Sequence, residues 1–462
     1  MLSVTTLGSF MAALDSNIVT IALPYMSTAL SAGFSLLSWV LVGYLLAFAA
    51  FVLQAGKLGD IYGKKKVYLI GFATFGLASA LCGVSPDAYQ LVAYRVLQGV
   101  GAAILLASGN PLIFASFPPK ERGAAVGINS VAFAVGSVAG PVVGGALTAV
   151  DWRLIFYVNV PIAVAAIAVA RKRIPAGLNA RGSSAVRLNI PNSVILAAAM
   201  ASVILWLTLS EARVLPVAIA GVAAFLVAES RSKSPLLNKE LLRTRGFVYS
   251  VVALGLVFAS YSGVVFAMSF YFQSVAGFSP LTAGLWVAPT PLTLAVVNPL
   301  AGRMFDRMRT PALLSIVGAF LALASFVLLS GAIATLAPGA EVLLLLASIG
   351  VAGGMQWAPT ISSVLRFSKQ ETRGVANGTA FSLVNIGNAT SIALVVSIST
   401  TALPSSLAEQ IRSGSVTGLI HASALLFDQG LSGAILGMAV VGAAALLCLI
   451  LTAREQRRNF EP

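Results

Sequence analysis

Apolar runs of about twenty residues recur along the whole chain, and they constrain the fold more than any other feature. A helix needs about 20 mostly apolar residues to cross a bilayer, where only helices and closed barrels satisfy their own backbone hydrogen bonds. The runs are continuous rather than alternating, which favours helices over barrel strands. Only 10% of the 462 residues are charged, against roughly 25% in soluble domains. The sequence therefore predicts an all-α integral membrane protein.

The apolar runs predict fourteen transmembrane helices. These spans lie approximately at 2–28, 37–56, 67–85, 89–115, 123–149, 153–170, 191–210, 213–230, 247–275, 280–300, 311–332, 341–366, 373–402 and 431–453. The first run begins almost at Met1 and reads as a retained span rather than a cleaved signal peptide.

The basic residues test this arrangement. Most of the 29 lysines and arginines fall in alternate predicted loops and in the C-terminal tail. Cytoplasmic loops of membrane proteins carry such an excess, so we expect both termini to be cytoplasmic. This topology, in the plasma or inner membrane of a prokaryote, accounts for the net charge of +14 without a nucleic-acid partner.

Two short segments recur in the second half of the chain. Residues 55–60 (AGKLGD) return as 301–306 (AGRMFD), and residues 122–127 (RGAAVG) return as 373–378 (RGVANG). Each pair sits at an equivalent place among the spans, so spans one to six match spans nine to fourteen. The sequence predicts a six-helix half over 1–170, a linker with two inserted helices over 171–246, and a second six-helix half over 247–462. Paired halves are typical of transporters.

The turn after the second span has its own pattern. Its glycines permit a tight turn with positive φ, and its aspartate can accept hydrogen bonds from a helix N-terminus. The residues of this predicted gating loop are Gly56, Asp60, Gly63 and Lys64, with Gly302 and Asp306 as counterparts in the second half. The alternative interpretation of the lysines is a simple positive-inside turn.

Three further motifs accompany this loop. They are residues 14–24 (LDSNIVTIALP), residues 95–103 (RVLQGVGAA), and Gly136 followed by residues 140–145 (GPVVGG). Together the four motifs resemble those of the major facilitator superfamily, and in detail its fourteen-span drug:proton antiporters. The resemblance covers essentially the whole chain and implies proton-coupled export by alternating access. The chain departs from the family pattern at three positions. Asn17 and Thr20 stand where the family usually has Thr and Asn, and Ile61 stands where an arginine is usual.

Asp15 and Arg95 are the only charged residues that we place well inside predicted spans. A charged group at a helix centre costs about 2.5–3.5 kcal/mol on insertion scales, and such groups usually serve ion or substrate pathways. We therefore expect a role in proton coupling or in binding a cationic substrate. An ion pair that merely fastens the first helix to the fourth is the alternative. Away from their ends, the predicted spans of the second half contain no acid.

The fifth span carries a ladder of small residues. It comprises Gly136, Gly140, Pro141, Gly144 and Gly145. Glycines at this spacing let helices approach closely, and proline permits bending. Simple helix packing is one interpretation; a bending or sealing surface during transport is the other, which the resemblance favours.

Polar and aromatic residues in the expected cavity-lining helices are candidates for substrate contact. They are Asn17, Gln54, Gln98, Asn110, Asn129, Trp286, Gln356, Trp357, Asn377 and Asn385. For each one singly, helix–helix packing is the competing role. Cys82 and Cys448 lie in apolar runs and suggest neither a disulfide nor a metal site.

The sequence predicts a transporter rather than an enzyme, with no cofactor and no metal. No nucleotide-binding motif is visible, so the energy must come from an ion gradient or from the substrate gradient. We expect a monomer that exchanges protons for amphiphilic drugs or related small molecules. An exporter of one specific metabolite and a lipid flippase remain alternatives. A membrane sensor would need a regulatory domain, which the sequence does not offer.

Overall fold

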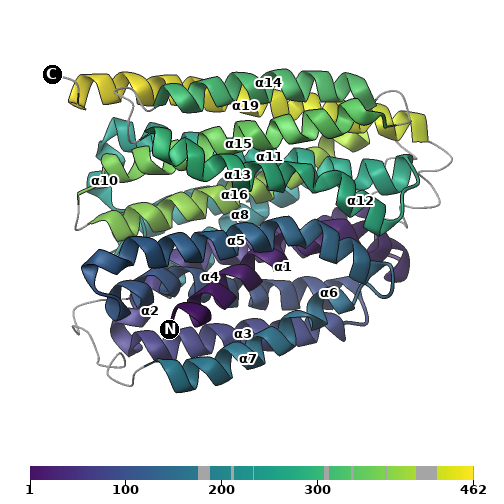
Figure 1. The fold of residues 1–462 in the computed structure, drawn as a ribbon. Coiled ribbons are helices and arrows are strands. Elements are labelled where there is room, and N and C mark those ends of the chain that lie inside the picture. Colours follow the sequence, from purple (N-terminus) through teal and green to yellow (C-terminus); the bar gives the residue numbers. More distant parts are fainter. Residues whose placement is uncertain are drawn as a thin grey trace. The chain divides into compact units, whose positions relative to one another are not determined.

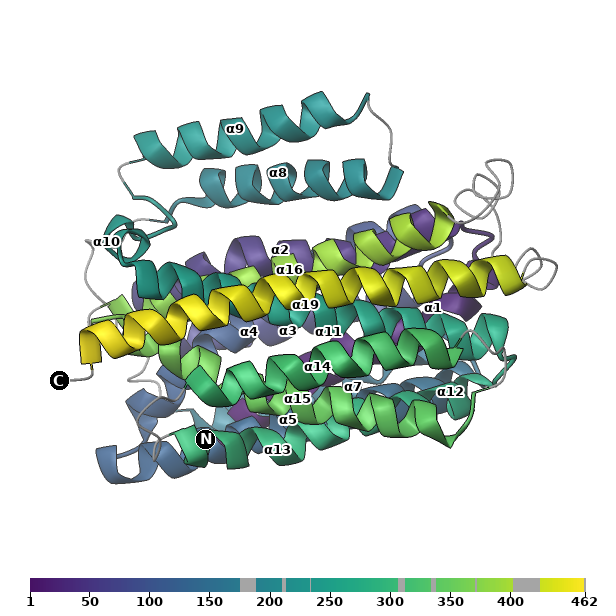
Figure 2. The same ribbon diagram turned by 90° about the horizontal axis from the view of Figure 1, so that it is seen from above.

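The computed structural model describes residues 1–174, 188–209, 213–232, 234–305, 312–333, 338–369, 372–401 and 424–460. Throughout these residues the regular elements are helices (Figures 1 and 2), which confirms the predicted all-α class. Thirteen helical segments of the described residues are long and apolar enough to cross a membrane. The remaining predicted span corresponds to a shorter helix of 17 residues.

Backbone contacts divide the chain into two compact units. The first comprises residues 1–26, 39–206 and 211–236. Its helices are α1 (Leu2–Ala29), α2 (Phe34–Tyr62), α3 (Lys64–Gly83), α4 (Ala88–Ser116), α5 (Pro119–Thr148), α6 (Leu154–Tyr157), α7 (Asn159–Arg173), α8 (Ile190–Leu209) and α9 (Leu215–Arg231).

Local sequence signals explain several helix boundaries in this unit. Asp87 caps α4, because its carboxylate accepts a hydrogen bond from the Gln90 backbone N–H at 2.9 Å. Pro119 occupies the first turn of α5, where its missing N–H costs nothing. The inserted helices α8 and α9 pack side by side (Figure 2): a methyl group at Gly221 would lie 2.7 Å from the Ser202 hydroxyl.

The second unit comprises residues 27–38, 207–210 and 237–462. Its elements are α10 (Lys239–Arg243), α11 (Arg245–Phe270), the π-helical turn η2 (Tyr271–Val275), α12 (Pro280–Val287), α13 (Pro289–Phe305), α14 (Ala312–Ile333), α15 (Ala340–Arg366), α16 (Arg373–Thr401) and α19 (Ala424–Phe460). The predicted tenth span is thus two helices, α12 and α13, with a break at Ala288.

The two units repeat the same packing within themselves. In the first unit α3 packs on α4 and on α7, and in the second α14 packs on α15 and on α19. Figure 1 shows α3 beside α7 and α14 beside α19. Glycines of α5 contact α1, and Gly387 of α16 contacts the backbone of Gly255 on α11 in the same way. The helices that carry the repeated sequence segments therefore occupy equivalent places.

Two expectations need correction. The predicted loop over residues 56–66 is almost entirely helical: α2 continues to Tyr62 and α3 begins at Lys64, because a single residue, Gly63 with φ 92°, makes the turn. The last span begins at Ala424 rather than near 431. Asp428 consequently lies within this spanning helix and is 1% exposed, so the second half does contain an acid in a span.

Candidate functional site

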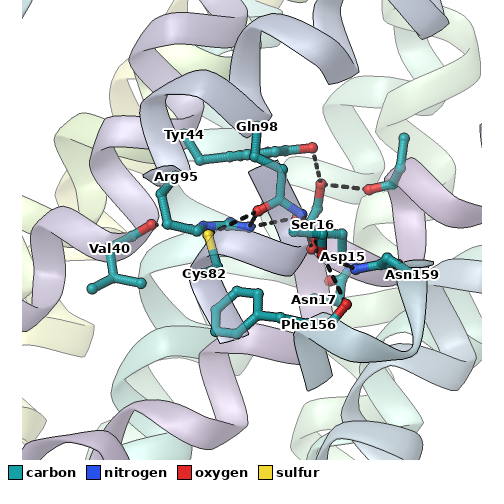
Figure 3. Close-up of polar contacts among 12 residues, drawn as sticks. Asp15, Ser16, Asn17, Val40, Tyr44, Cys82, Arg95, Gln98, Phe156 and Asn159 are labelled. Carbon is teal, nitrogen blue, oxygen red and sulfur yellow. Dashed lines mark hydrogen bonds and ion pairs between the residues drawn. The ribbon is translucent and has the colours of Figure 1, made fainter. Parts of the chain in front are cut away.

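Asp15 lies midway along α1 and is completely buried within the first unit. Two helices bring three polar side chains to its carboxylate: Arg95 and Gln98 from α4, and Asn159 from the first turn of α7. Figure 3 shows these side chains converging on the aspartate. All four are 0% exposed.

The Asp15 carboxylate accepts three hydrogen bonds from side chains of other helices. Arg95 Nη1 donates to Asp15 Oδ2 at 2.6 Å. Gln98 Nε2 and Asn159 Nδ2 donate to Asp15 Oδ1 at 2.8 and 3.0 Å. The arrangement therefore fits the ionised carboxylate, which accepts and does not donate. The structure also contains the Asp15–Arg95 ion pair on which the alternative, purely structural interpretation depends.

Arg95 is also held from the opposite side by α2. Its Nε donates to the Val40 carbonyl at 3.0 Å, and its guanidinium lies 4.3 Å from the centre of the Tyr44 ring. Its Nη1 donates in addition to Gln98 Oε1 at 2.7 Å, whereas Nη2 has no hydrogen-bond partner in the part of the chain that the structure describes. Arg95 thus keeps contacts with α2 and α4 that do not depend on Asp15.

Ser79 of α3 extends the network. Gln98 Nε2 and Asn159 Nδ2 both donate to its hydroxyl at 3.2 Å, and the hydroxyl donates to the Phe156 carbonyl at 2.8 Å. Breaking a buried ion pair by removing one partner typically costs about 3–5 kcal/mol. The hydrogen bonds of the network join α1, α3, α4 and α7. A change in the charge of Asp15 consequently affects the contacts of all four helices.

The glycine ladder of α5 packs against the turns of α1 on both sides of Asp15. A methyl group on Gly136 would lie 2.5 Å from the Phe10 carbonyl oxygen, and one on Gly140 would lie 2.6 Å from Asn17 Cβ. One on Gly144 would lie 2.7 Å from the Ile18 carbonyl oxygen. Only glycine permits this approach. Pro141 and Gly145, the other two residues of the motif, are buried in the same helix.

Glycines of the fourth-span motif have a comparable function. A methyl group on Gly99 would lie 2.3 Å from the Tyr44 carbonyl oxygen of α2, and one on Gly101 would lie 2.7 Å from the Phe75 nitrogen of α3. These two residues let α4 approach both neighbours closely. The motif thereby fixes the position from which Arg95 reaches Asp15.

The predicted gating residues are distributed differently from expectation. Gly63 makes the turn, but Gly56 and Asp60 lie inside α2, and a methyl group on Gly56 would meet nothing within 4 Å. Lys64 is the first residue of α3. Gly302 lies in α13, where an added methyl group would lie 3.5 Å from Ala358 Cβ. The side chain of Asp60 and the whole of Asp306 lie outside the described residues.

Of the candidates for substrate contact, only Gln98 belongs to the Asp15 network. Asn17, Gln356 and Asn385 donate to carbonyls of their own helices. Gln54 donates to the Asn189 carbonyl and Asn129 accepts from Ser9. Trp286 packs on Phe272 and Phe278, and Trp357 packs on Phe258 and Phe381. Asn110 has a buried carbonyl oxygen without a partner among the described residues, and Asn377 is half-buried. A substrate-binding role for these residues stays a prediction.

Sequence reasoning missed Asn159, Ser79 and Tyr44. Asn159 carried a usable signal, because an amide inside a predicted span needs a buried partner. Serine and tyrosine occur so often in such helices that their residue type alone did not separate Ser79 and Tyr44 from the others.

Comparison with known proteins identifies the family of the chain. Residues 5–392 match the family description Major Facilitator Superfamily. The multidrug resistance protein Stp of Mycobacterium tuberculosis is 32% identical over 317 residues, which are 66% of this chain and 58% of Stp. The tetracenomycin C resistance and export protein of Streptomyces glaucescens is 32% identical over 404 residues, which are 84% of this chain and 73% of that protein. The chain thus spans little more than half the length of Stp.

A solved structure shows the same fold. The bacterial homologue of the human lysosomal transporter Spinster, in an inward-facing and unoccupied conformation, aligns with a TM-score of 0.71 at 16% sequence identity. The alignment covers 98% of this chain and 96% of that one. From the family match over most of its length, its relatives and its helical architecture, the chain is a multi-pass membrane protein that belongs to the Major Facilitator Superfamily.

Proposed function

We propose that this transporter exports amphiphilic small molecules in exchange for protons, and that Asp15 is its proton-carrying group. The observation that carries the proposal is the completely buried carboxylate of Asp15, which accepts hydrogen bonds from three side chains of two other helices. The resistance and export activities named for Stp and the tetracenomycin C protein support the direction of transport and the substrate class.

Protonation of Asp15 would change the contacts of α1. A neutral carboxyl group gives up its charge-assisted hydrogen bond to Arg95, which is among the stronger kinds of hydrogen bond. Arg95 would stay in place, because Val40 and Tyr44 of α2 hold it independently. Proton binding therefore loosens α1 from α4 while leaving α4 attached to α2.

The glycine ladder transmits this change. Since Gly136, Gly140 and Gly144 contact α1 at backbone distance, α5 must follow any displacement of the Asp15 turn. In this mechanism α1 and α5 are held to α4 by the Asp15–Arg95 contact when Asp15 is ionised, and they are released from α4 when Asp15 is protonated. Such a two-state element is what alternating access requires.

The test uses Asp15→Asn, which keeps the size of the side chain and fixes its neutral form. Asp151→Asn, at an exposed position before α6, is the matched control. In proteoliposomes with a fluorescent cationic substrate, the Asp15 variant should bind substrate but lose efflux driven by a pH gradient. Substrate addition should no longer release protons, and substrate counterflow should persist, because counterflow needs no net proton movement.

Two outcomes would contradict the assignment. Undiminished proton-coupled efflux by Asp15→Asn would leave the ion pair as a purely structural contact. Loss of binding for cationic substrates, with neutral substrates still exchanged for protons, would make Asp15 a counter-charge for the substrate.

Export of one specific metabolite is the second candidate, which the tetracenomycin C export protein favours. A susceptibility panel in an efflux-deficient host separates the two. Resistance to many unrelated amphiphiles supports the broad exporter, whereas resistance confined to one chemical class supports the specific one.

A further inference from the structure

The second unit contains a buried acid that the Asp15 mechanism does not use. Asp428 lies in the first turns of α19 and is 1% exposed. Its Oδ1 atom has no hydrogen-bond partner in the described part of the chain. The described residues form two ion pairs, Arg95–Asp15 and Lys369–Glu240, and Asp428 takes part in neither. An ionised carboxylate in this position would be neither paired nor fully solvated.

The phenol of Tyr271 is a second polar group at the same place. Tyr271 begins the π-helical turn η2, which packs against α19, and its side chain interacts electrostatically with the Asp428 carboxylate. Tyr271 is 0% exposed, and its hydroxyl also lacks a hydrogen-bond partner among the described residues. Isolated π-helical turns are rare and occur frequently at functional sites. Two buried oxygen atoms without a hydrogen-bond partner among the described residues thus lie on two elements that pack together, α19 and η2.

Aromatic packing fixes this junction. Phe34 contacts Phe427, the residue before Asp428, with ring centroids 6.1 Å apart. It also contacts Phe270, the residue before Tyr271, at 4.6 Å. The Phe34 ring therefore packs against both α19 and the end of α11. These aromatic side chains form an apolar environment, which disfavours an unpaired charge on Asp428.

The facing turns of the described helices that pack on α19 offer Asp428 no counter-charge. The helices α11, α14 and α16 also pack on α19, and their facing turns, residues 263–270, 326–333 and 393–400, contain no titratable side chain. Glu341, in the first turn of α15, is exposed and acidic, and it interacts with Tyr271.

The hydroxyl nearest along the same face of α19 is already engaged. Ser432, four residues after Asp428, donates to the Ser330 carbonyl of α14 at 2.8 Å and shares a hydrogen bond with the Ser330 hydroxyl at 2.9 Å. This pair is therefore engaged, whereas the hydroxyls of Tyr271, Ser274 and Ser399 have no hydrogen-bond partner among the described residues; of these we assign Tyr271 as the donor to an ionised Asp428.

We propose that Asp428 and Tyr271 form a second proton-binding site, in the unit that does not contain Asp15. Asp428 holds the proton while the junction is closed and dry. When the junction opens, the carboxylate ionises and accepts the hydrogen bond that the Tyr271 hydroxyl has available. The role of this site in transport rests on the proton exchange proposed above; proton binding by Asp428 itself does not.

The experiment is infrared titration of the purified full chain in lipid nanodiscs, following the carbonyl band of protonated carboxyl groups. Asp15→Asn serves as the background, so that the carboxyl group of the first proposed proton site is silent. Adding Asp428→Asn should remove a pH-dependent carboxyl band, and adding Glu341→Gln, a nearby exposed acid, should leave that band unchanged. Tyr271→Phe should retain the band and shift the midpoint of its titration. An unchanged spectrum on adding Asp428→Asn would overturn the proposal, as would a band that responds to a cationic substrate but not to pH.

A transport measurement separates this inference from the proposed function. If Asp428 titrates but substrate movement releases no protons, the antiport proposal fails and the proton-binding site stands. If transport is proton-coupled and no Asp428 band exists, only the second site fails. Melting of Asp428→Asn close to that of the unsubstituted chain confirms that the variant is folded.

Discussion

Gly144→Ala tests whether the contact between α5 and α1 controls the Asp15 site. The added methyl group would lie 2.7 Å from the Ile18 carbonyl oxygen and 2.9 Å from Ile18 Cγ1. Ordinary contact begins at 3.4 Å, so the two helices must separate locally by 3.4 − 2.7, or about 0.7 Å. Backbone atoms cannot rotate away as a flexible side chain can. Overpacking of this kind costs about 1–3 kcal/mol.

Gly127→Ala is the matched control on the same helix, because a methyl group there meets nothing within 4 Å. Both variants gain the same helix propensity, up to about 1 kcal/mol. The difference between them therefore isolates the cost of the contact with α1. An energy of 1–3 kcal/mol corresponds to roughly a 5- to 150-fold change in an equilibrium constant.

The assay compares apparent melting temperature and initial rate of pH-driven efflux for purified, reconstituted protein. Gly144→Ala should insert normally, melt below Gly127→Ala and transport several-fold more slowly, because Ile18 lies one turn from Asp15. The larger Gly144→Val should abolish efflux. If Gly144→Ala and Gly127→Ala behave alike in both measurements, close packing at this position has no role and the coupling of α5 to α1 is refuted.

Three further predictions address the network, the turn and the topology. Asn159→Leu removes donors to Asp15 and Ser79 and should destabilise the protein by about 1–3 kcal/mol, measured as a lower melting temperature; unaltered melting would show that Asn159 is dispensable. Lys65→Ala removes hydrogen bonds from Lys65 Nζ to the last carbonyls of α7 and should lower stability by about 1 kcal/mol, whereas Lys64→Ala should not. Cysteine at exposed position 151 should react with a membrane-impermeant reagent on intact cells and cysteine at exposed position 66 should not; the reverse pattern would invert the topology.

The sequence by itself determined the class of fold. Apolar runs longer than twenty residues leave a chain few alternatives to spanning helices, since a bilayer supplies no partner for an unpaired backbone group. All the predicted spans correspond to helices. Helix ends were less certain: α19 extends beyond its predicted start because Asp428, although polar, is tolerated inside a helix that buries it.

The sequence also singled out Asp15, Arg95 and the glycines of α5, since charges and G-x-x-x-G spacings are conspicuous in apolar segments. Only the tertiary structure decided what they contact. Asn159 is 144 positions from Asp15 along the chain, and no local pattern encodes which helix faces another. The ion pair, the donors around it and the unpartnered Asp428 depend on how helices pack, because a buried polar group acquires its role from the partners that packing gives or denies it.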